Sequence, residues 1–364
     1  MNKKKAVIIT IYDPNPNMGN RLQNYAVQTV LQNMELETVS IAFRKCILNK
    51  KTKIKLAIHK MTNYRFTSNT EFWKLMPGQI KAFNQFNDKY IKTLHIKDIN
   101  DIPQADFYVL GSDQIWNPQW WNTENPYMEK NIYFATFAKA ENIVCFSPSF
   151  GKSDIPDEWI SWFRRNLHKI DKLTVREEEG RQIIKRLTRK EALVTIDPTL
   201  MIEAPEWDKI ADMPQNIDIN KNYILTYFLG GRSKKIDEDI KNYAEQLNAE
   251  VYYLFDRQYT ELFFVNPSEF LTLIKNARLI LTDSFHACVF SFIYQKPFLV
   301  YEREDAKGMM SRINTLLQKF HLERKYINSG LKNDLLECEY EDGYKILEIE
   351  REKLQKYLQE AFIK

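Results

Sequence analysis

The sequence predicts an α/β protein made of two Rossmann-like domains with parallel sheets and a cleft between them. Its 364 residues exceed what one hydrophobic core usually organises. Short β-branched or aromatic runs alternate with longer helical patterns, which is typical of parallel sheets covered by helices on both faces. A polar, proline-containing stretch at 205–221 interrupts this alternation, which then restarts. We therefore expect one domain on each side of that stretch.

The predicted strands are short apolar runs bounded by turn residues. The first helix is expected to begin near Arg21, with Asn20 as its cap. The strands before the linker are 5–12, 37–43, 107–111, 142–151, 172–180 and 192–200, and those after it are 223–231, 250–255, 277–283 and 296–302.

These elements divide the chain into an N-terminal domain (1–204), a linker (205–221) and a C-terminal domain (222–342). The last segment, 343–364, is an amphipathic helix that could pack back across either domain, and we place it on the N-terminal one. In open parallel sheets, ligands bind at the carboxyl ends of the strands. The active site is therefore expected at the strand ends that face the cleft.

Composition excludes several classes of protein. The 52 Lys+Arg and 48 Asp+Glu leave a net charge of +4, too mild for a nucleic-acid partner. The four cysteines form no CxxC pair, which favours reduced thiols over disulfides, and we find no cluster of metal ligands. The N-terminus reads as a first strand and not as a signal peptide, and the longest apolar stretch, 287–294, is too short to span a bilayer. We expect a cytoplasmic protein.

Polar residues follow the first predicted strand. Gly19 permits close backbone approach, and the helix start behind it offers free N–H groups to an anion. Asn20, Gln23 and Asn24 are amides that could bind a ligand. The alternative is an ordinary capped helix.

The third predicted strand is followed by a second polar group. Ser112, Asp113, Trp116 and Asn117 combine a hydroxyl, a carboxylate, an indole and an amide within a few residues. This combination suits recognition of an array of sugar hydroxyls. The alternative is a turn with Trp116 packed beneath it.

Two arginines leave strands at the predicted cleft. Arg176 suits bidentate binding of phosphate or carboxylate, and its alternative role is a structural salt bridge to Glu177 or Glu178. Arg232 follows two glycines in the C-terminal domain and repeats this theme. Asp197, before a proline, is expected only to cap a neighbouring element.

The segment Asp283–His286 is the strongest candidate. A buried strand ends at Thr282, Asp283 or Ser284 caps the next helix, and His286 lies in its first turn. The positive end of the helix macrodipole disfavours a charged imidazolium, so we expect a ring that can accept a proton near pH 7. The alternative is a histidine that belongs to the core.

A charged loop follows the last predicted strand. Its cations Lys307 and Arg312 could close over an anionic ligand. The alternative is a solvated surface loop.

The order and spacing of these segments resemble the polysaccharide pyruvyl transferase family. The matching pieces are Gly19–Tyr25, Val109–Trp116, Ser149–Gly151, Val175–Glu177, Asp197–Thr199 and Thr282–Ala287. The resemblance implies the GT-B arrangement of two Rossmann-like domains. It also implies transfer of pyruvate from phosphoenolpyruvate onto two hydroxyls of one sugar, which forms a cyclic ketal and releases phosphate. The acceptor would be a surface polysaccharide or its lipid-linked precursor, with phosphoenolpyruvate as co-substrate and no cofactor or metal.

This resemblance implies roles for the candidate residues. Some branches of the family carry an arginine where this chain has Ser284, so another cation is expected beside His286. The implied catalytic residues are His286, Asp283 and Asp113; the donor-binding residues are Arg176, Arg232, Ser284, Lys307 and Arg312; the acceptor-binding residues are Gly19, Asn20, Gln23, Asn24, Ser112, Trp116 and Asn117.

Segment 44–65 is rich in Lys and Arg, with no acidic residue between Glu37 and Glu71. Interleaved apolar residues would let it approach anionic lipids, peripherally at the inner face of a membrane. The alternative is a solvated flap beside the cleft.

Two other functions fit the same sequence. One is a GT-B glycosyltransferase, which would bind a nucleoside diphosphate where a pyruvyl transferase binds phosphoenolpyruvate. The other is a non-catalytic glycan-binding protein, which would tolerate the loss of His286 and Arg176.

Overall fold

The structure is a computed structural model of the chain. It describes residues 3–12, 16–43, 70–121, 126–215, 217–256, 258–303, 310–331 and 334–363. The basic segment 44–65 and Lys307 lie outside the described residues.

Within the described ranges, the first sheet has five parallel strands. They are β1 (Lys5–Ile9), β2 (Glu37–Ala42), β3 (Thr93–His95), β4 (Phe107–Leu110) and β5 (Ile143–Cys145). Their spatial order is β3-β2-β1-β4-β5, which is the order of a Rossmann sheet. The direction of winding reverses between β1 and β4, so the ligand-binding switch point of this sheet lies at the carboxyl ends of those two strands.

The second sheet is also parallel. It contains β8 (Tyr223–Tyr227), β9 (Glu250–Tyr253), β10 (Leu279–Thr282) and β11 (Phe298–Val300). Its order, β11-β10-β8-β9, is that of a doubly wound sheet whose switch point lies between β8 and β10. The predicted fold class, two Rossmann-like units in a GT-B-like arrangement, is confirmed.

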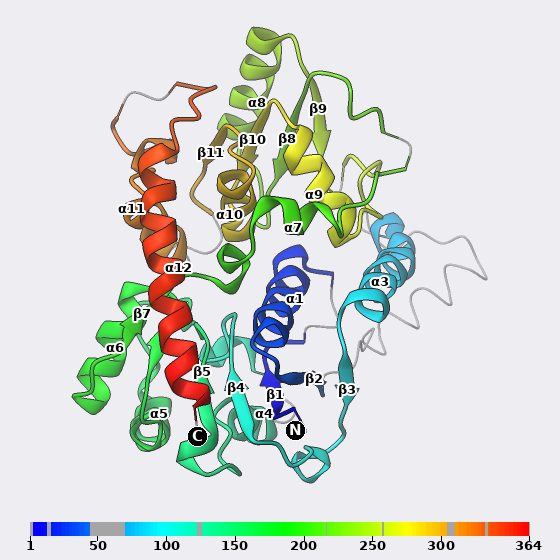
Figure 1. The fold of residues 1–364 in the computed structure, drawn as a ribbon. Helices are drawn as coiled ribbons and strands as arrows, with labels where there is room; N and C mark the ends of the chain where they lie inside the picture. Colours follow the sequence, from blue (N-terminus) through cyan, green and yellow to red (C-terminus); the bar gives the residue numbers. More distant parts are fainter. Residues whose placement is uncertain are drawn as a thin grey trace.

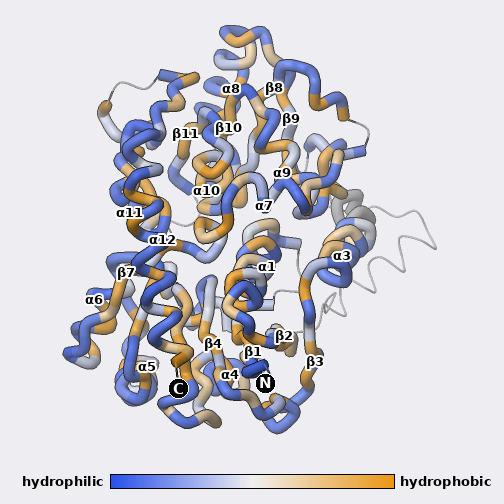
Figure 2. Tube along the Cα trace, in the orientation of Figure 1, coloured by the Kyte–Doolittle hydropathy of each residue, from blue (hydrophilic) through white to orange (hydrophobic). Residues whose placement is uncertain are grey.

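Helices cover both sheets, which occupy separate halves of the molecule (Figure 1). Helix α10 is buried along its whole length, as expected for a helix whose residues are almost all apolar (Figure 2). The helices are α1 (Met18–Asn33), α3 (Thr70–Tyr90), α4 (Pro126–Tyr133), α5 (Asp157–Lys169), α6 (Glu178–Thr188), α7 (Ala204–Asp208), α8 (Lys234–Leu247), α9 (Pro267–Asn276), α10 (Phe285–Ile293), α11 (Ser311–Lys319) and α12 (Glu341–Phe362), with short 3₁₀ helices at Ile99–Asp101, Pro118–Trp120, Ala140–Asn142, Pro198–Met201 and Glu323–Lys325.

Strands β6 (Thr174–Val175) and β7 (Leu193–Val194) form a separate pair and do not extend the first sheet. The predicted strand 142–151 stops at Cys145 because Ser147 has a φ of 54° and a proline follows it. Beyond that point β6 is joined to the first sheet through side chains: the Thr174 hydroxyl accepts a hydrogen bond from the Ser147 N–H at 3.1 Å. The predictions that 178–180 and 195–200 are strand were wrong, because α6 begins at Glu178 and the chain after Val194 turns into the 3₁₀ helix Pro198–Met201.

The described helices include none that is long and apolar enough to cross a membrane. The first helix begins at Met18, with Asn17 as its cap, so the predicted start near Arg21 with Asn20 as cap was wrong. The short edge strand β3 was not predicted at all.

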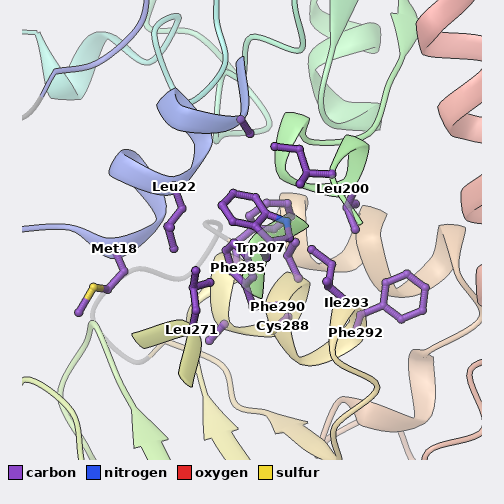
Figure 3. Packing of buried hydrophobic residues seen from close by; sticks show 14 of the residues in the cluster. Met18, Leu22, Leu200, Trp207, Leu271, Phe285, Cys288, Phe290, Phe292 and Ile293 are labelled. Atoms are coloured by element: carbon purple, nitrogen blue, oxygen red, sulfur yellow. The ribbon is translucent and has the colours of Figure 1, made fainter. Parts of the chain in front are cut away.

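One hydrophobic cluster joins the two halves of the molecule. Met18 and Leu22 of α1 belong to the same buried cluster as Leu271 of α9 and Phe285 of α10 (Figure 3). Trp207 of α7 lies in the stretch predicted as a polar linker, yet it is fully buried. Its ring packs edge-on against Phe290, with the ring centroids 4.9 Å apart. A large apolar contact of this kind holds two domains in one relative position.

The C-terminal helix α12 contacts both halves. Near its start, the Tyr344 hydroxyl donates a hydrogen bond to the Ile293 carbonyl at 2.6 Å. Near its end, the Phe362 ring packs on Phe107 of β4 with centroids 4.9 Å apart. The helix thus runs alongside the two sheets (Figure 1).

Candidate active site

A cavity of about 260 Å³ lies where the two switch points face each other. This volume is slightly below the roughly 300–1,000 Å³ of most small-molecule sites, so it suits a compact ligand. Residues after β1, β4, β8 and β10 all reach it. The lining residues are Ile11, Asn17, Asn20, Asp113, Gln114, Trp120, Leu229, Asp283, Ser284, Phe285, His286, Arg303, Arg312 and Ile313.

The N-termini of two helices open on this cavity. Asn17 and Asn20 of α1 line one side, and Ser284 and Phe285 of α10 line the other. Ser284, the cap of α10, makes no side-chain capping hydrogen bond. Because the N–H groups of a helix's first turn have no partner within the helix, two such ends create a favourable place for an anion.

His286 lies in the first turn of α10, at the contact between α10 and α1. A β-carbon added at Gly19 would lie 1.8 Å from its Nδ1, so the ring occupies the space that a side chain at position 19 would need. Its Nε2 is 3.7 Å from Asp197 Oδ2. That nitrogen is buried and has no hydrogen-bond partner among the atoms described here.

Arg176 is almost fully buried and holds two carboxylates beside His286. Its guanidinium forms an ion pair with Asp197 and lies 3.5 Å from Asp113 Oδ1. Burial, the largest single influence, would raise the pKa of both carboxyl groups, but Arg176, His286 and the hydrogen-bond donors around them together hold each pKa below its usual range. Both are therefore ionised at neutral pH.

Of the two expected uses of Arg176, the structure favours a salt bridge, but with Asp197 and Asp113 as partners. Glu177 instead accepts hydrogen bonds from the Phe150 and Gly151 N–H groups at 2.7 and 3.0 Å. Burial raises the pKa of Glu177.

Arg312 is buried at the cavity with no carboxylate at ion-pair distance in the described ranges. Its guanidinium lies over the Phe285 ring, 5.5 Å from the centroid, and its Nε has no acceptor there. Burial, followed by repulsion from Arg176, lowers its pKa to about 10, so it remains charged at neutral pH. None of the described carboxylates would therefore have to be released from Arg312 before it binds an anion.

Asp283 lines the cavity and holds a neighbouring loop in place. Its two oxygens accept hydrogen bonds from the Leu229 and Gly230 N–H groups at 2.7 and 2.9 Å. The Nε of Arg303, a residue that the sequence did not single out, lies 3.3 Å from Asp283 Oδ2. Asp283 thus fixes the loop after β8 to the end of β10, and it positions the cavity wall.

Three residues predicted to bind the acceptor are buried beneath the loop after β4. Trp116 is 0% exposed and donates its Nε1 hydrogen to the Tyr133 carbonyl at 3.2 Å. The Ser112 hydroxyl bonds to the Ser147 carbonyl at 3.0 Å, and Asn117 caps the following 3₁₀ helix. These polar groups already have partners and do not line the cavity, so the alternative, a turn packed over Trp116, is the one observed.

The polar residues of α1 divide in the same way. Asn20 lines the cavity and donates its amide to Asp113 Oδ2 at 3.1 Å. Gln23 bonds to the Thr10 hydroxyl at 2.9 Å, and Asn24 accepts from Ser40 at 2.6 Å, away from the cavity. Gly19 makes room for the His286 ring and does not line the cavity itself.

Other residues line the site although the sequence did not single them out. Trp120 is 47% exposed, and its Nε1 donates to Gln114 Oε1 at 3.1 Å. An exposed aromatic at a cavity wall has no signal in a single sequence that would separate it from buried Trp116. Asp197, which the sequence predicted to cap a neighbouring element, does cap the 3₁₀ helix Pro198–Met201, but its ion pair with Arg176 was not predicted.

Arg232 lies in a neighbouring cavity and not in this one. Its guanidinium is paired with Asp237 and Asp256. Within the described ranges, no group of three or more His, Cys, Asp or Glu is arranged to hold a metal ion.

Comparison with known proteins gives the family. The model of the family described as polysaccharide pyruvyl transferase matches residues 17–305. A search of curated sequences found no match. Similar solved structures include UDP-GlcNAc 2-epimerase from Methanocaldococcus jannaschii (14% identity, 95% of this chain and 99% of that one, TM-score 0.41) and UDP-N-acetylglucosamine 2-epimerase from Rickettsia bellii (10% identity, 99% and 97%, TM-score 0.44). Because the family model covers most of the sequence, the chain belongs to the polysaccharide pyruvyl transferase family.

Proposed function

We propose that this chain transfers pyruvate from phosphoenolpyruvate to two hydroxyls of one sugar, which forms a cyclic ketal and releases phosphate. The acceptor would be a sugar of a surface polysaccharide or of its lipid-linked precursor. One observation carries the proposal: Arg312 and His286 line the same small cavity, and Arg312 has no carboxylate partner among the described residues. A compact anion that needs a proton is the ligand that such a cavity suits best.

Phosphoenolpyruvate carries a phosphate and a carboxylate. Arg312 and the N-terminus of α10 would bind one of these groups, and Arg303 at the cavity wall would bind the other. Arg176 would act indirectly, because it is paired with Asp197 and Asp113 and does not line the cavity. Arg312 would thus supply the positive charge that other branches of the family place at position 284.

The reaction requires the protein to donate two protons and to accept two. In the first step, His286 would protonate C3 of the enol as a sugar hydroxyl attacks C2, and Asp113 would take the hydroxyl proton. An oxygen bonded to an oxocarbenium-like carbon is strongly acidic, so a carboxylate of lowered pKa is basic enough. In the second step, the C2–O bond to phosphate breaks and the second hydroxyl forms its bond to C2. Its proton returns to His286, and the proton on Asp113 leaves with phosphate.

Asp197 would act as a positioning residue. It stays ionised 3.7 Å from His286 Nε2 and would stabilise the imidazolium that donates the proton. Trp120 would offer an apolar face to the acceptor sugar at the cavity wall, beside the polar Asp113 and Gln114.

Binding of two small ligands separates this function from the rival ones. Isothermal titration with phosphoenolpyruvate and with UDP should show saturable binding of phosphoenolpyruvate alone. Binding of UDP without phosphoenolpyruvate would favour a nucleotide-sugar glycosyltransferase. Binding of neither, together with glycan binding that survives His286→Gln, would favour a non-catalytic glycan-binding protein.

A lipid-linked acceptor would make membrane contact useful, and we propose that segment 44–65 approaches anionic lipids. Its excess of Lys and Arg supports this proposal. Sedimentation with phosphatidylglycerol vesicles should exceed sedimentation with phosphatidylcholine vesicles and should fall with salt. Equal sedimentation with the two lipids would contradict it.

A further inference from the structure

A second cavity, of about 580 Å³, lies at the carboxyl ends of β8 and β9. It shares Leu229 with the active-site cavity, so the two are separated only by the loop after β8. The proposed reaction leaves this cavity unused. Its lining residues are Tyr227, Phe228, Leu229, Gly230, Gly231, Arg232, Asp237, Phe255, Asp256 and Gln258.

An ordered aromatic platform lies beside this second cavity. The rings of Tyr253 and Tyr259 are stacked with centroids 4.0 Å apart and an interplanar angle of 12°. Arg232 lies over both, with its Cζ 5.0 Å from the Tyr253 centroid and 6.0 Å from that of Tyr259. Neither tyrosine lines the cavity itself, but Tyr259 remains 41% exposed, so its ring is accessible to a ligand that extends from the cavity past Arg232.

The charges of this cavity disfavour an anion. Its cation Arg232 donates from Nε to Asp237 Oδ1 at 2.7 Å and is also paired with Asp256. Among the described lining residues, the one cation is therefore already paired with carboxylates and is not available to a phosphate or a nucleoside diphosphate. Carboxylate oxygens can instead accept hydrogen bonds from neutral hydroxyl groups.

We propose that this cavity binds a neutral sugar ring of the acceptor, namely the residue next to the one that receives pyruvate. The C–H face of a sugar is apolar and suits the exposed Tyr259 ring, while its hydroxyls suit Asp256. The glycan would pass over Leu229, whose backbone N–H donates a hydrogen bond to Asp283 Oδ1 at 2.7 Å and is thereby held in place. This inference rests on the proposed function, because that function puts the terminal sugar in the adjacent cavity.

The test compares wild type, Tyr259→Ala, Tyr259→Phe and the control Phe137→Ala on an array of neutral oligosaccharides. Phe137 is a matched control because it is an aromatic of similar exposure, 39%, that packs on Tyr108 of the first sheet, lines neither cavity and does not contact Arg232. Wild type should bind some glycans of two or more residues. Tyr259→Ala should weaken that binding at least tenfold, while Tyr259→Phe and Phe137→Ala should leave it nearly unchanged.

A titration with phosphoenolpyruvate separates failure of this inference from failure of the proposed function. The affinity for phosphoenolpyruvate should be the same in Tyr259→Ala as in wild type. Unchanged glycan binding in Tyr259→Ala, no glycan binding by wild type, or UDP binding that Tyr259→Ala abolishes would each overturn the sugar site. Glycan binding that depends on Tyr259 without any phosphoenolpyruvate binding would keep the sugar site and overturn the pyruvyl transfer.

Discussion

The imidazole of His286 lies against the backbone of Gly19, so that a β-carbon at position 19 would come within 1.8 Å of Nδ1. Gly19 belongs to α1, beside the first sheet, and His286 belongs to α10, beside the second. Contact between these helices therefore sets the position of the proposed proton donor. The site exists only when both halves of the chain are in place.

Gly19→Ala should lower kcat by about tenfold to a hundredfold, because an imidazole shifted by an ångström loses its alignment with the substrate. The substitution alone should favour the helix by about 1 kcal/mol, so lost helicity would not explain the result. The measurement is steady-state phosphate release. Asn33→Ala, at an exposed position in the last turn of α1, is the control. Full activity of Gly19→Ala would show that the contact is dispensable.

Arg312→Gln should raise the Kd for phosphoenolpyruvate about tenfold to a hundredfold, because a hydrogen bond to a charged group contributes about 1.5–3 kcal/mol. Titration calorimetry measures this change. Arg324→Gln is the matched control, since its side chain is 63% exposed and lies outside the active-site cavity. An unchanged Kd in Arg312→Gln would remove this arginine from the donor site.

Asp197→Asn should destabilise the fold by about 3 kcal/mol at pH 7, because it deprives the buried Arg176 of its closest partner. Arg176 holds the pKa of Asp197 below its value in the unfolded chain. This stabilisation is therefore fully present above about pH 4, the unfolded value, and is lost as the pH falls further.

Urea unfolding at pH 7 and pH 3 measures this effect. The difference in unfolding free energy between wild type and Asp197→Asn should be smaller at pH 3. Asp154→Asn, whose side chain is 65% exposed and pairs with Arg186 at the surface, should change stability by no more than about 0.5 kcal/mol. A difference for Asp197→Asn that does not vary with pH would argue against the ion pair as its source.

Two nearby tryptophans should respond oppositely to truncation. Trp116→Ala should cost about 3–5 kcal/mol of stability, because the side chain is fully buried. Trp120→Ala should leave stability nearly unchanged and should raise KM for the acceptor without changing KM for phosphoenolpyruvate. Thermal unfolding and steady-state kinetics check the pair. A normal acceptor KM in Trp120→Ala would place the sugar elsewhere.

The sequence predicted the architecture because buried parallel strands are read from local composition. The runs around β1, β4, β8 and β10 are apolar and lie between helical patterns, so each was located to within a few residues. Strand ends were less accurate, since they depend on backbone geometry such as the positive φ of Ser147. The short edge strand β3 has too few buried residues to give a signal.

The strand-end rule predicted which loops meet at one cavity, but it did not predict which side chains face that cavity. His286, Asp113 and Arg312 line one cavity as the rule suggested. Whether a polar side chain faces that cavity or the core depends on its rotamer and on partners distant in the sequence. For this reason Trp116 and Arg232 were misplaced, and the partnership of Arg176 with Asp197 was not foreseen.

Turnover of phosphoenolpyruvate and a glycan by the protein would demonstrate the proposed reaction itself. Phosphate release from phosphoenolpyruvate should occur only with a glycan acceptor, and each phosphate should match one pyruvyl ketal found on the glycan by mass spectrometry. His286→Gln should bind phosphoenolpyruvate normally but turn over about 10²–10⁴-fold more slowly. Turnover by His286→Gln at the wild-type rate would remove the histidine from the chemistry, and phosphate release without any ketal would rule out pyruvyl transfer.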